Sequence, residues 1–374
     1  MKTGTEHEYS LNGPGFVPLP ESDLVLAEIG GGWDGEMPLG GAKACKELQK
    51  HVIELIPLHP SESLSDLESS VQGGVREFSR RFAGRYRLLG LGMHPTLSLD
   101  RAQVWDHGEG EYYTAYDRLF GIRQHGWLNI QALQVNFEYP DESRLVSLHN
   151  RIRCLLPFLI AVSAASPFVE GKAPGPVDNR LLFYRENQAR IPAICNGIVP
   201  DPISTVADYR DRLSGMYAEL RAQGAGVLCE EWVASSGVIV RFSRPCIEIK
   251  AIDEQECVFS DMALCAFVRA LARARDLPLE EDRDTLVAMT ERAIRAGTAG
   301  LEDELAALYR RAEKVATGDE RRYLPLVRTR IEEGSLGQVL AERFYDTGDL
   351  QGIMQDLAMC LEENRPYVGN SEWV

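Results

Sequence analysis

The chain has 374 residues, enough for one large domain or two ordinary ones, and 44% of them are hydrophobic, as in a globular protein. Forty Lys and Arg against 56 Asp and Glu give a net charge of −16, which argues against nucleic acid or an anionic membrane as the main partner. The eight cysteines include no Cys-x-x-Cys pair, so neither a zinc site nor a disulfide framework is indicated. We expect a cytoplasmic protein with free thiols, no signal peptide and no membrane partner.

The first predicted strand, Thr3–Leu11, carries two carboxylates at alternate positions. Because side chains alternate between the two faces of a strand, Glu6 and Glu8 share one face and His7 lies on the other. Two like charges this close repel each other and are costly to bury, so a buried pair needs a cation or a shared proton. The alternatives are a solvent-exposed edge strand and a divalent-metal site, and the metal site requires more inward carboxylates downstream.

The next segments alternate between loops, helices and two further strands. A Gly- and Pro-rich loop covers 12–20, and helices are predicted near 22–29 and at 63–83. The strand at 52–56 has Glu54 in its middle, on a face shared with two aliphatic residues, whereas Glu47 is interpreted as a surface helix residue. A strand at 85–95 ends near His94, which either contacts a ligand or caps the turn.

The segment Asn129–Tyr139 follows a helix at 111–120 and reads as the fourth strand because polar and apolar residues alternate along it. Leu133, Val135 and Phe137 form an apolar back, whereas Gln134, Asn136 and Glu138 form a polar front. This polar front either binds a ligand or is open to water.

A long helix is predicted at 141–165. Its apolar part, Cys154–Phe168, is too short to span a bilayer and reads as a buried helix. After a loop at 166–176, Arg180 and Arg185 are candidates for binding a carboxylate or phosphate, since a planar guanidinium binds such groups through two hydrogen bonds. Arg190 fits a solvent-exposed helix face equally well.

A helix at 208–222 leads into a predicted hairpin. Val238, Val240 and Phe242 face the core, which puts Arg241 on the opposite side, and Glu248 and Lys250 occupy the polar face of the partner strand Cys246–Asp253. The remainder is expected to be helical, at 262–275, 286–296, 302–316, 320–333, 336–345 and 350–363. We therefore expect a catalytic α+β domain over residues 1–260 and a helical C-terminal extension over 261–374 packed on it.

The polar face of one antiparallel sheet would collect acidic, amide and basic side chains from all of these strands. The set comprises Glu6, Glu8, Glu54, Gln134, Asn136, Arg241, Glu248 and Lys250. Mg²⁺ prefers oxygen ligands and keeps part of its coordination shell for phosphate and water, so this composition favours Mg²⁺ ions bound to ATP phosphates. Arginine or lysine would neutralise the phosphoryl group during transfer.

In these motifs the chain resembles a known family, the glutamate–cysteine ligase family of the second type, which includes carboxylate–amine ligases. The resemblance covers about Thr3 to Asp261 in collinear order. Its motifs are Gly4-Thr5-Glu6-His7-Glu8, Glu47 with Val52-Ile53-Glu54, Gly92-Met93-His94-Pro95, Gln134-Val135-Asn136, Leu156-Pro157-Phe158 through Asp178-Asn179-Arg180, and Ile247 through Asp253. It implies a glutamine-synthetase-like fold, in which helices flank a curved antiparallel sheet of about six strands around Mg²⁺ and ATP.

The resemblance also implies roles for individual positions. Metal binding would fall to Glu6, Glu8, Glu54 and Glu248, substrate binding to Arg180 with Arg185 and His94, nucleotide contacts to Gln134, Asn136 and Lys250, and catalysis to Arg241 and Lys250. Gln134 stands where many members have histidine, so it is a weaker metal ligand or a nucleotide contact. Lys250 stands where the family usually has arginine. Lysine keeps the positive charge but lacks the forked geometry of a guanidinium.

The function implied is that of an ATP-dependent ligase joining the side-chain carboxylate of glutamate, or a similar acid, to an amine through an acyl phosphate. Cysteine is the family's best-known acceptor, but nothing in the sequence identifies a thiol pocket, so another amino acid or small amine is the alternative. A non-catalytic nucleotide- or ligand-binding homologue is the alternative from a different class. By analogy of fold, a homodimer is possible.

Overall fold

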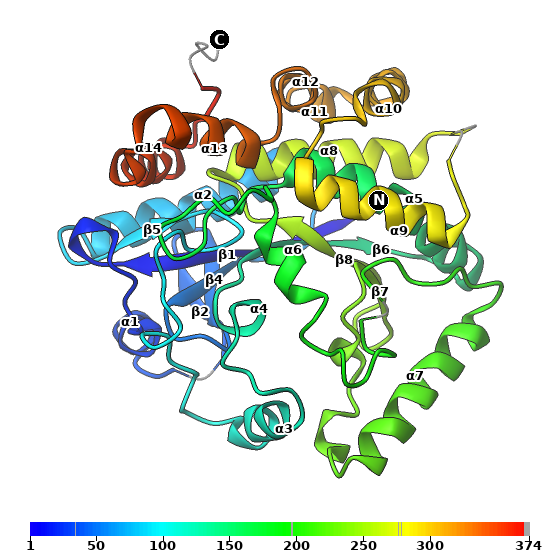
Figure 1. Cartoon of the computed structure of the whole chain (residues 1–374), viewed down its shortest axis with the longest axis horizontal. Coiled ribbons are helices and arrows are strands. Elements are labelled where there is room, and N and C mark those ends of the chain that lie inside the picture. The colour runs from blue at the N-terminus through cyan, green and yellow to red at the C-terminus, as the bar shows by residue number, and fades with distance from the viewer. Residues whose placement is uncertain (34, 196, 276, 278, 370–374) are drawn as a thin grey trace.

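The structure is a computed structural model that describes residues 1–33, 35–195, 197–275, 277 and 279–369. At its centre lies an antiparallel sheet of eight strands in the order β2-β3-β4-β1-β6-β8-β7, with β5 paired to β1 (Figure 1). The strands are β1 (Thr3–Asn12), β2 (Met37–Leu39), β3 (Ala42–Lys46), β4 (Val52–Pro57), β5 (Arg87–Leu89), β6 (Ala132–Glu138), β7 (Val238–Arg241) and β8 (Cys246–Asp253). The predicted α+β fold built on an antiparallel sheet is confirmed.

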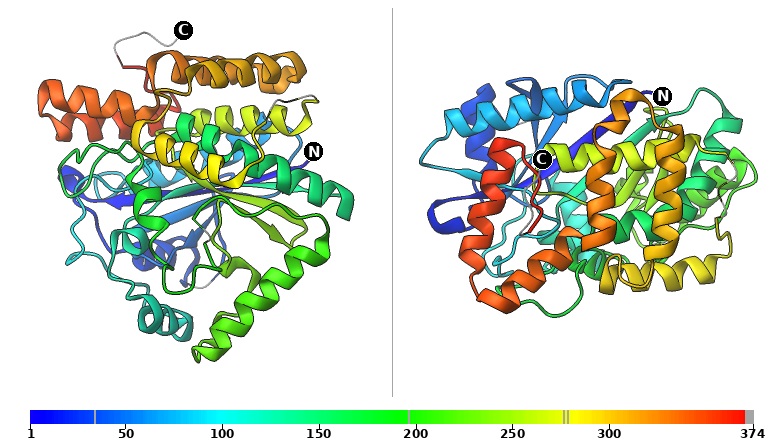
Figure 2. Two further views of the ribbon diagram at one scale, coloured as in Figure 1. Left: turned by 45° about the vertical axis from the view of Figure 1, so that its right-hand side comes forward. Right: turned by 90° about the horizontal axis from the view of Figure 1, so that it is seen from above.

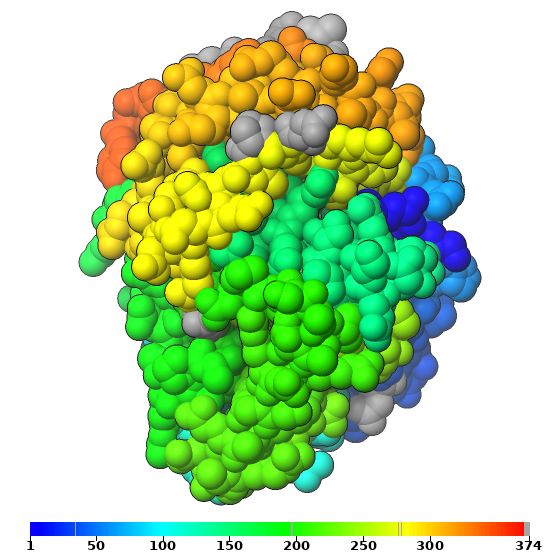
Figure 3. Space-filling view, turned by 90° about the vertical axis from the view of Figure 1, so that its right-hand side faces the viewer, coloured from blue at the N-terminus to red at the C-terminus, as the bar shows by residue number. Residues whose placement is uncertain are grey.

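Helices cover the back of this sheet in two layers, which the two views of Figure 2 separate. The inner layer contains α2 (Leu64–Arg81), α5 (Glu142–Ser163) and α8 (Val258–Arg273). The outer helices are α9 (Arg283–Ala296), α10 (Glu302–Val315), α11 (Gly318–Arg321), α12 (Leu324–Glu333), α13 (Leu336–Thr347) and α14 (Leu350–Glu363). On the face shown in Figure 3, α5, α9 and α7 (Val206–Ala222) form one continuous surface.

The front of the sheet is covered differently, by short helices and connecting segments. These elements are α1 (Ser22–Gly30), α3 (Gly110–Phe120), α4 (His125–Leu128), α6 (Asn179–Tyr184) and α7, with the single 3-10 turns η1 (Pro14–Phe16), η2 (Gly226–Leu228) and η3 (Glu231–Val233) (Figure 1). The front is therefore the side on which a cavity can form.

Strand β1 separates the core from the front by its alternation. Thr5, His7 and Tyr9 are buried on the side of the inner helices, where His7 contacts Asp261 of α8. Glu6 and Glu8 occupy the opposite face, and Glu8 lies opposite Glu54 in the register between β1 and β4. The alternation predicted for this strand is confirmed.

Helix α5 is long and apolar enough, by length and composition, to cross a membrane, but 78% of its apolar window is buried inside the protein. It packs against β8, α8 and α9. The helix is therefore part of the core, as predicted for Cys154–Phe168, and this burial is consistent with a soluble protein.

The structure differs from the predicted elements in three places. The hairpin β2–β3 was not predicted, and the strand expected at 85–95 is limited to Arg87–Leu89. The single helix expected at 320–333 is two helices, α11 and α12, because Pro325 stands at the start of α12, where it has no N–H to continue the preceding helix.

The predicted division of the chain at residue 261 falls inside α8. That helix contacts α2 and α5 of the inner layer and also α10 and α12 of the outer layer. Glu320 of α11 fastens the two layers, since its carboxylate accepts a hydrogen bond of 2.7 Å from Nε of Arg269 in α8. The predicted organisation, one catalytic domain over residues 1–260 with a helical extension over 261–374 packed on it, stays a prediction.

Candidate active site

The front of the sheet forms the floor of a cavity of about 560 Å³, which we call the front cavity. Its walls combine acidic, basic and aromatic side chains. The lining includes Glu6, Glu8, Glu47, Glu54, Glu109 and Gln134, the cations Lys46, Arg180, Arg244 and Lys250, and the aromatic residues Tyr112, Tyr113, Tyr116, Tyr184, Trp127 and Trp232. The aromatic residues come mainly from α3 and from the short helices that cover the front.

Three carboxylates on this floor form a compact group, which we call the carboxylate cluster. Glu8, Glu47 and Glu54 each offer an oxygen, and these oxygens all lie within 4.8 Å of one another. Burial and repulsion from Glu47 raise the pKa of Glu8 to about 8. Burial, together with neighbouring carboxylates, also raises the pKa of Glu54 well above its usual value. The cluster is therefore unfavourable when fully ionised.

A divalent ion fits the donors that this cluster presents. All are carboxylate oxygens, the ligand type that Mg²⁺ prefers, and they are close enough to share one ion. Glu8 is further oriented by the main-chain N–H of Ala132 at 2.9 Å and by the side-chain amide of Gln134 at 3.0 Å. The interpretation of Glu47 as a surface helix residue is wrong, because Glu47 directly follows β3 and joins the cluster.

Two predicted site residues act on the carboxylates through their amide groups. Gln134 donates to Oε1 of Glu8, and Asn136 donates from Nδ2 to Oε1 of Glu6 at 3.0 Å. Gln134 lines the front cavity, whereas Asn136 lines a second cavity described below. In this structure both amides orient acidic side chains, and their contacts to a nucleotide stay a prediction.

Glu248 is held apart from the cluster by two cations. Nη1 of Arg241 lies 2.6 Å from its Oε2, and Nζ of Lys250 lies 3.3 Å from its Oε1. Burial favours a raised pKa for this carboxyl, but the charges of Lys250 and Arg241 outweigh burial and lower the pKa. Glu248 is thus already neutralised within the protein, and its predicted metal ligation is not supported by this arrangement.

Arg241 was predicted to be catalytic, and its contacts correct that role. Its guanidinium bridges Glu248 and Glu231, with Nε 3.2 Å from Oε1 of Glu231. Arg241 is absent from the described lining of both cavities. Its Nη1 and Nε donate to Glu248 and Glu231, so in this structure Arg241 positions these two carboxylates. Lys250, by contrast, does line the front cavity.

Arg180 is buried at the inner end of the front cavity. Its Nε donates to Oδ1 of Asp253 at 2.5 Å, and its Nη1 donates to the main-chain oxygen of Lys250 at 3.2 Å. Nη2 is buried and has no hydrogen-bond partner among the residues that the structure describes. A fixed guanidinium with one uncommitted nitrogen is suited to a substrate carboxylate.

Two of the predicted substrate-binding residues lie outside the site. Arg185 forms ion pairs with Glu186 and Glu291 and is not part of the described cavity linings. His94 is completely buried, and its Nε2 lies 2.7 Å from Oδ1 of Asn12. Burial lowers the pKa of His94 to about 3, so it is a neutral core residue. These contacts do not support a substrate-binding role for either residue, whereas the alternative that His94 caps the turn agrees with the hydrogen bond of 3.2 Å that its Nδ1 accepts from the main-chain N–H of Thr96.

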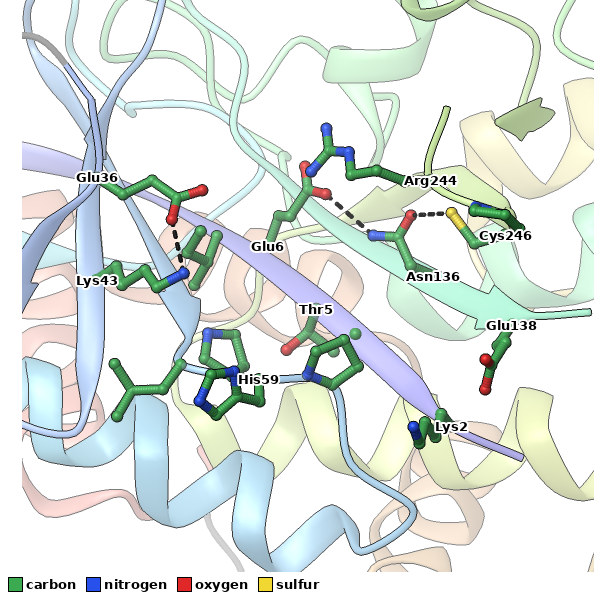
Figure 4. Close-up of a pocket in the computed structure, with 16 residues that line it drawn as sticks. Lys2, Thr5, Glu6, Glu36, Lys43, His59, Asn136, Glu138, Arg244 and Cys246 are labelled. Atoms are coloured by element: carbon green, nitrogen blue, oxygen red, sulfur yellow. Dashed lines mark hydrogen bonds and ion pairs between the residues drawn. The ribbon is translucent and has the colours of Figure 1, made fainter. Parts of the chain in front are cut away.

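A second cavity of about 600 Å³ opens beside the start of β1 (Figure 4). Lys43 of β3 and Glu36 form an ion pair of 2.6 Å on one side, and Asn136 lies on the other. Glu6 and Arg244 line this cavity and the front cavity alike, so the two cavities meet at these residues.

Sequence reasoning missed Glu47 and Arg244 in particular. A signal for Glu47 was present, because Gly40-Gly41 is a typical two-residue hairpin turn and would have placed Glu47 at the end of a strand beside the sheet. Arg244 lies in the turn between β7 and β8, where strand alternation does not apply.

The family model for glutamate–cysteine ligase family 2 matches residues 2–358, and the chain belongs to this family. It is 50% identical over 369 residues to a protein of Archaeoglobus fulgidus described as uncharacterized, covering 98% of this chain and 100% of that one. It is 27% identical over 181 residues to a protein of Rhodococcus jostii named "Putative glutamate–cysteine ligase 2-3", covering 47% of this chain and 21% of that one.

Solved structures share the fold at low sequence identity. Glutamate–cysteine ligase from Francisella tularensis in complex with AMP has a TM-score of 0.68 at 12% identity, covering 98% of this chain and 89% of that one. A bifunctional glutathione synthetase from Pasteurella multocida has a TM-score of 0.62 at 14% identity, covering 97% and 51%. Family membership and these neighbours support an ATP-dependent carboxylate–amine ligase.

Proposed function

We propose that this protein is an ATP-dependent ligase that forms an amide between the side-chain carboxylate of glutamate, or a similar acid, and an amine. The carboxylate cluster carries the proposal. One buried and two half-buried carboxylates lie within reach of one another, burial and neighbouring carboxylates raise their pKa values, and the group is therefore unfavourable when ionised unless a cation or a proton is bound. A protein without metal chemistry would have little reason to keep so costly a group, and turnover distinguishes the ligase from a non-catalytic nucleotide-binding homologue.

Residues of the front cavity supply the functions that such a reaction needs. Glu8, Glu47 and Glu54 would hold Mg²⁺, which in turn would bind the phosphates of ATP and neutralise part of their charge. Arg180 would bind a carboxylate of the acid through Nη2. Lys250 would add positive charge near the reacting groups.

The chemistry proceeds in two steps whose atoms balance. A carboxylate oxygen of the acid attacks the γ-phosphorus of ATP, the bond from that phosphorus to the β,γ-bridging oxygen breaks, and ADP leaves with the electron pair. The amine nitrogen then attacks the acyl carbon, phosphate leaves, and the nitrogen loses a proton to give the amide. The protein contributes alignment and charge neutralisation.

Glutamate as the acid and cysteine as the amine are the first substrates to test, because one relative is named a putative glutamate–cysteine ligase and one structural neighbour is a glutamate–cysteine ligase. The alternative is a ligase of the same fold acting on another acid or amine. We also propose that the enzyme works in the cytoplasm on small molecules, without nucleic acid or membrane, and forms a homodimer. Light scattering coupled to size-exclusion chromatography tests the oligomeric state directly.

The decisive experiment measures ADP release by the purified protein with Mg²⁺-ATP and glutamate, with and without each member of a panel of amines that includes cysteine. Product mass is determined by mass spectrometry. Amine-dependent ADP release with a γ-glutamyl product supports the proposal and identifies the acceptor. Mg²⁺-dependent ATP binding without turnover for any acid and amine pair would contradict the proposed substrates.

A further inference from the structure

Arg244 occupies the junction of the two cavities. It lies in the turn at 242–245 between β7 and β8, and it belongs to the lining of both cavities together with Glu6. Figure 4 shows its guanidinium extending toward the Glu6 carboxylate. Its positive charge acts on Glu6 and also on Glu54 of the carboxylate cluster.

Each of the other three cations of the front cavity forms an ion pair with an acidic side chain, although Nη2 of Arg180 has no partner among the described residues. Lys46 lies 2.6 Å from Glu109, Arg180 lies 2.5 Å from Asp253, and Lys250 lies 3.3 Å from Glu248. Within the described part of the chain, the guanidinium of Arg244 alone among these four makes no hydrogen bond or ion pair. Its charge is therefore available to a bound anion.

The backbone of the turn that carries Arg244 is held in place on both sides, by hydrogen bonds before Arg244 and by strand β8 after it. The carboxylate of Glu231 accepts hydrogen bonds from the main-chain N–H groups of Phe242 at 2.8 Å and Ser243 at 3.1 Å. The same carboxylate holds Arg241, and Cys246 begins β8 directly after Pro245. The exposed guanidinium can move while its Cα stays in place.

We propose that Arg244 is a catalytic residue that contacts the γ-phosphoryl group during its transfer from ATP to the acid. This assignment rests on the proposed function. Arg244 and Glu6 are the residues common to both linings, and the charge of Arg244 already acts on Glu54 of the carboxylate cluster, so phosphate oxygens bound to a cation on that cluster would lie in the field of this guanidinium. As the bond to the β,γ-bridging oxygen breaks and the bond to the carboxylate oxygen forms, Arg244 donates hydrogen bonds to the equatorial oxygens of the transferring group.

The test compares Arg244→Ala and Arg244→Lys with a matched control, Arg310→Ala, which removes an exposed arginine from the outer helix α10. Single-turnover ADP formation is measured with Mg²⁺-ATP and the acid. Affinities for the magnesium complexes of ADP and of a non-hydrolysable ATP analogue are measured in parallel by calorimetry. Thermal unfolding checks that each variant folds as the wild type does.

We expect Arg244→Ala to slow single-turnover ADP formation by about 10²- to 10³-fold, the usual effect of removing one donor to a developing charge. Arg244→Lys should recover part of the rate. Arg244→Ala should also weaken binding of the ATP analogue more than binding of ADP, because only the analogue has a γ-phosphoryl group. Arg310→Ala should leave all three quantities unchanged.

Failure of this assignment is distinguishable from failure of the proposed function. If wild-type protein shows no turnover with any substrate, the proposed function fails, and the ratio of analogue to ADP affinity still tests Arg244. A wild-type rate or an unchanged affinity ratio in Arg244→Ala would overturn the assignment. An equal loss of ADP and analogue affinity would also overturn it, because it places the guanidinium on the α- or β-phosphate.

Discussion

The carboxylate of Asp253 lies directly against Gly92: a Cβ added at Gly92 would stand 2.3 Å from the carboxyl carbon and within 2.6 Å of both oxygens. The same carboxylate binds Nε of Arg180 and accepts a hydrogen bond of 2.7 Å from Oγ of Ser166. Glycine at position 92 thus provides the space in which the Arg180–Asp253 pair forms.

Gly92→Ala should therefore displace Asp253 and loosen Arg180. Because the obstructing atoms belong to a buried carboxylate, we expect a loss of about 1–3 kcal/mol in the free energy of unfolding. The KM for the acid should rise more than kcat falls. Denaturant unfolding and steady-state kinetics measure both. Gly215→Ala is the control, since nothing lies within 4 Å of its added Cβ in α7, and it should be neutral or stabilising.

Glu54→Gln should remove one charge from the carboxylate cluster while preserving shape. We expect the metal-free variant to be more stable than the wild type, because repulsion by Glu6 and Glu47 is relieved. Mg²⁺-dependent nucleotide binding should weaken by at least about tenfold, or about 1.4 kcal/mol. Calorimetric titration and thermal unfolding test these expectations. Glu304→Gln on the exposed face of α10 serves as the control, and equal behaviour of the two variants would argue against a metal role for Glu54.

The stability of the metal-free protein should depend on pH in a defined direction. Burial and Glu47 raise the pKa of Glu8 from 4.5 to about 8, so the folded state binds its proton more tightly than the unfolded state does. The associated stabilisation is present below pH 4.5 and is lost as the pH rises through about 8. Melting temperatures measured with a chelator should fall over this range.

Magnesium should reverse this trend, because the metal replaces the protons on the cluster. Affinity for Mg²⁺ should increase with pH, and binding should release protons, which calorimetry in buffers of different ionisation enthalpy detects. Glu8→Gln should flatten the pH dependence. Retention of the full slope in that variant would assign the effect to other groups.

Arg241→Ala should destabilise the protein strongly, because it leaves the buried carboxylate of Glu248 with Lys250 as its remaining cationic partner. Breaking a buried ion pair in this way costs about 3–5 kcal/mol. The double variant Arg241→Met with Glu248→Met should recover much of the stability. Denaturant unfolding of the single and double variants measures the coupling, and additive effects would show that the pair is not a unit.

The sequence predicted the elements whose pattern is local and strong. Alternation in β1 placed Glu6 and Glu8 correctly on one face, and the same argument oriented β6 and gave the bounds of β8. The hairpin β2–β3 was missed because its strands are short, with three residues in β2 and five in β3, and because the middle residue of β2 is Pro38. Missing that hairpin also meant misplacing Glu47.

Contacts between side chains that lie far apart in the sequence could not be predicted from sequence patterns. His94 was expected either to contact a ligand or to cap its turn, and pattern alone could not decide. In the structure its Nδ1 accepts from the main-chain N–H of Thr96, while Asn12 and Asn129 contact its ring and main chain in the core. Arg241 was assigned to the correct face of its strand, yet its role depends on Glu231, ten residues earlier and outside the hairpin. Alternation indicates where a side chain points, whereas its partners depend on packing that no short sequence window contains.

Strand β1 has consequences for how this protein tolerates change. Its odd-numbered residues Thr5, His7 and Tyr9 belong to the core, and Glu6 and Glu8 between them belong to the cavity. An insertion or deletion of one residue here would exchange the two sets, turning acidic groups inward and core groups outward. A point substitution on one face of β1 can therefore change the cavity without changing the core. A change in the length of the strand alters both. Natural variants should thus differ in which residues stand at these positions and never in the number of residues between them.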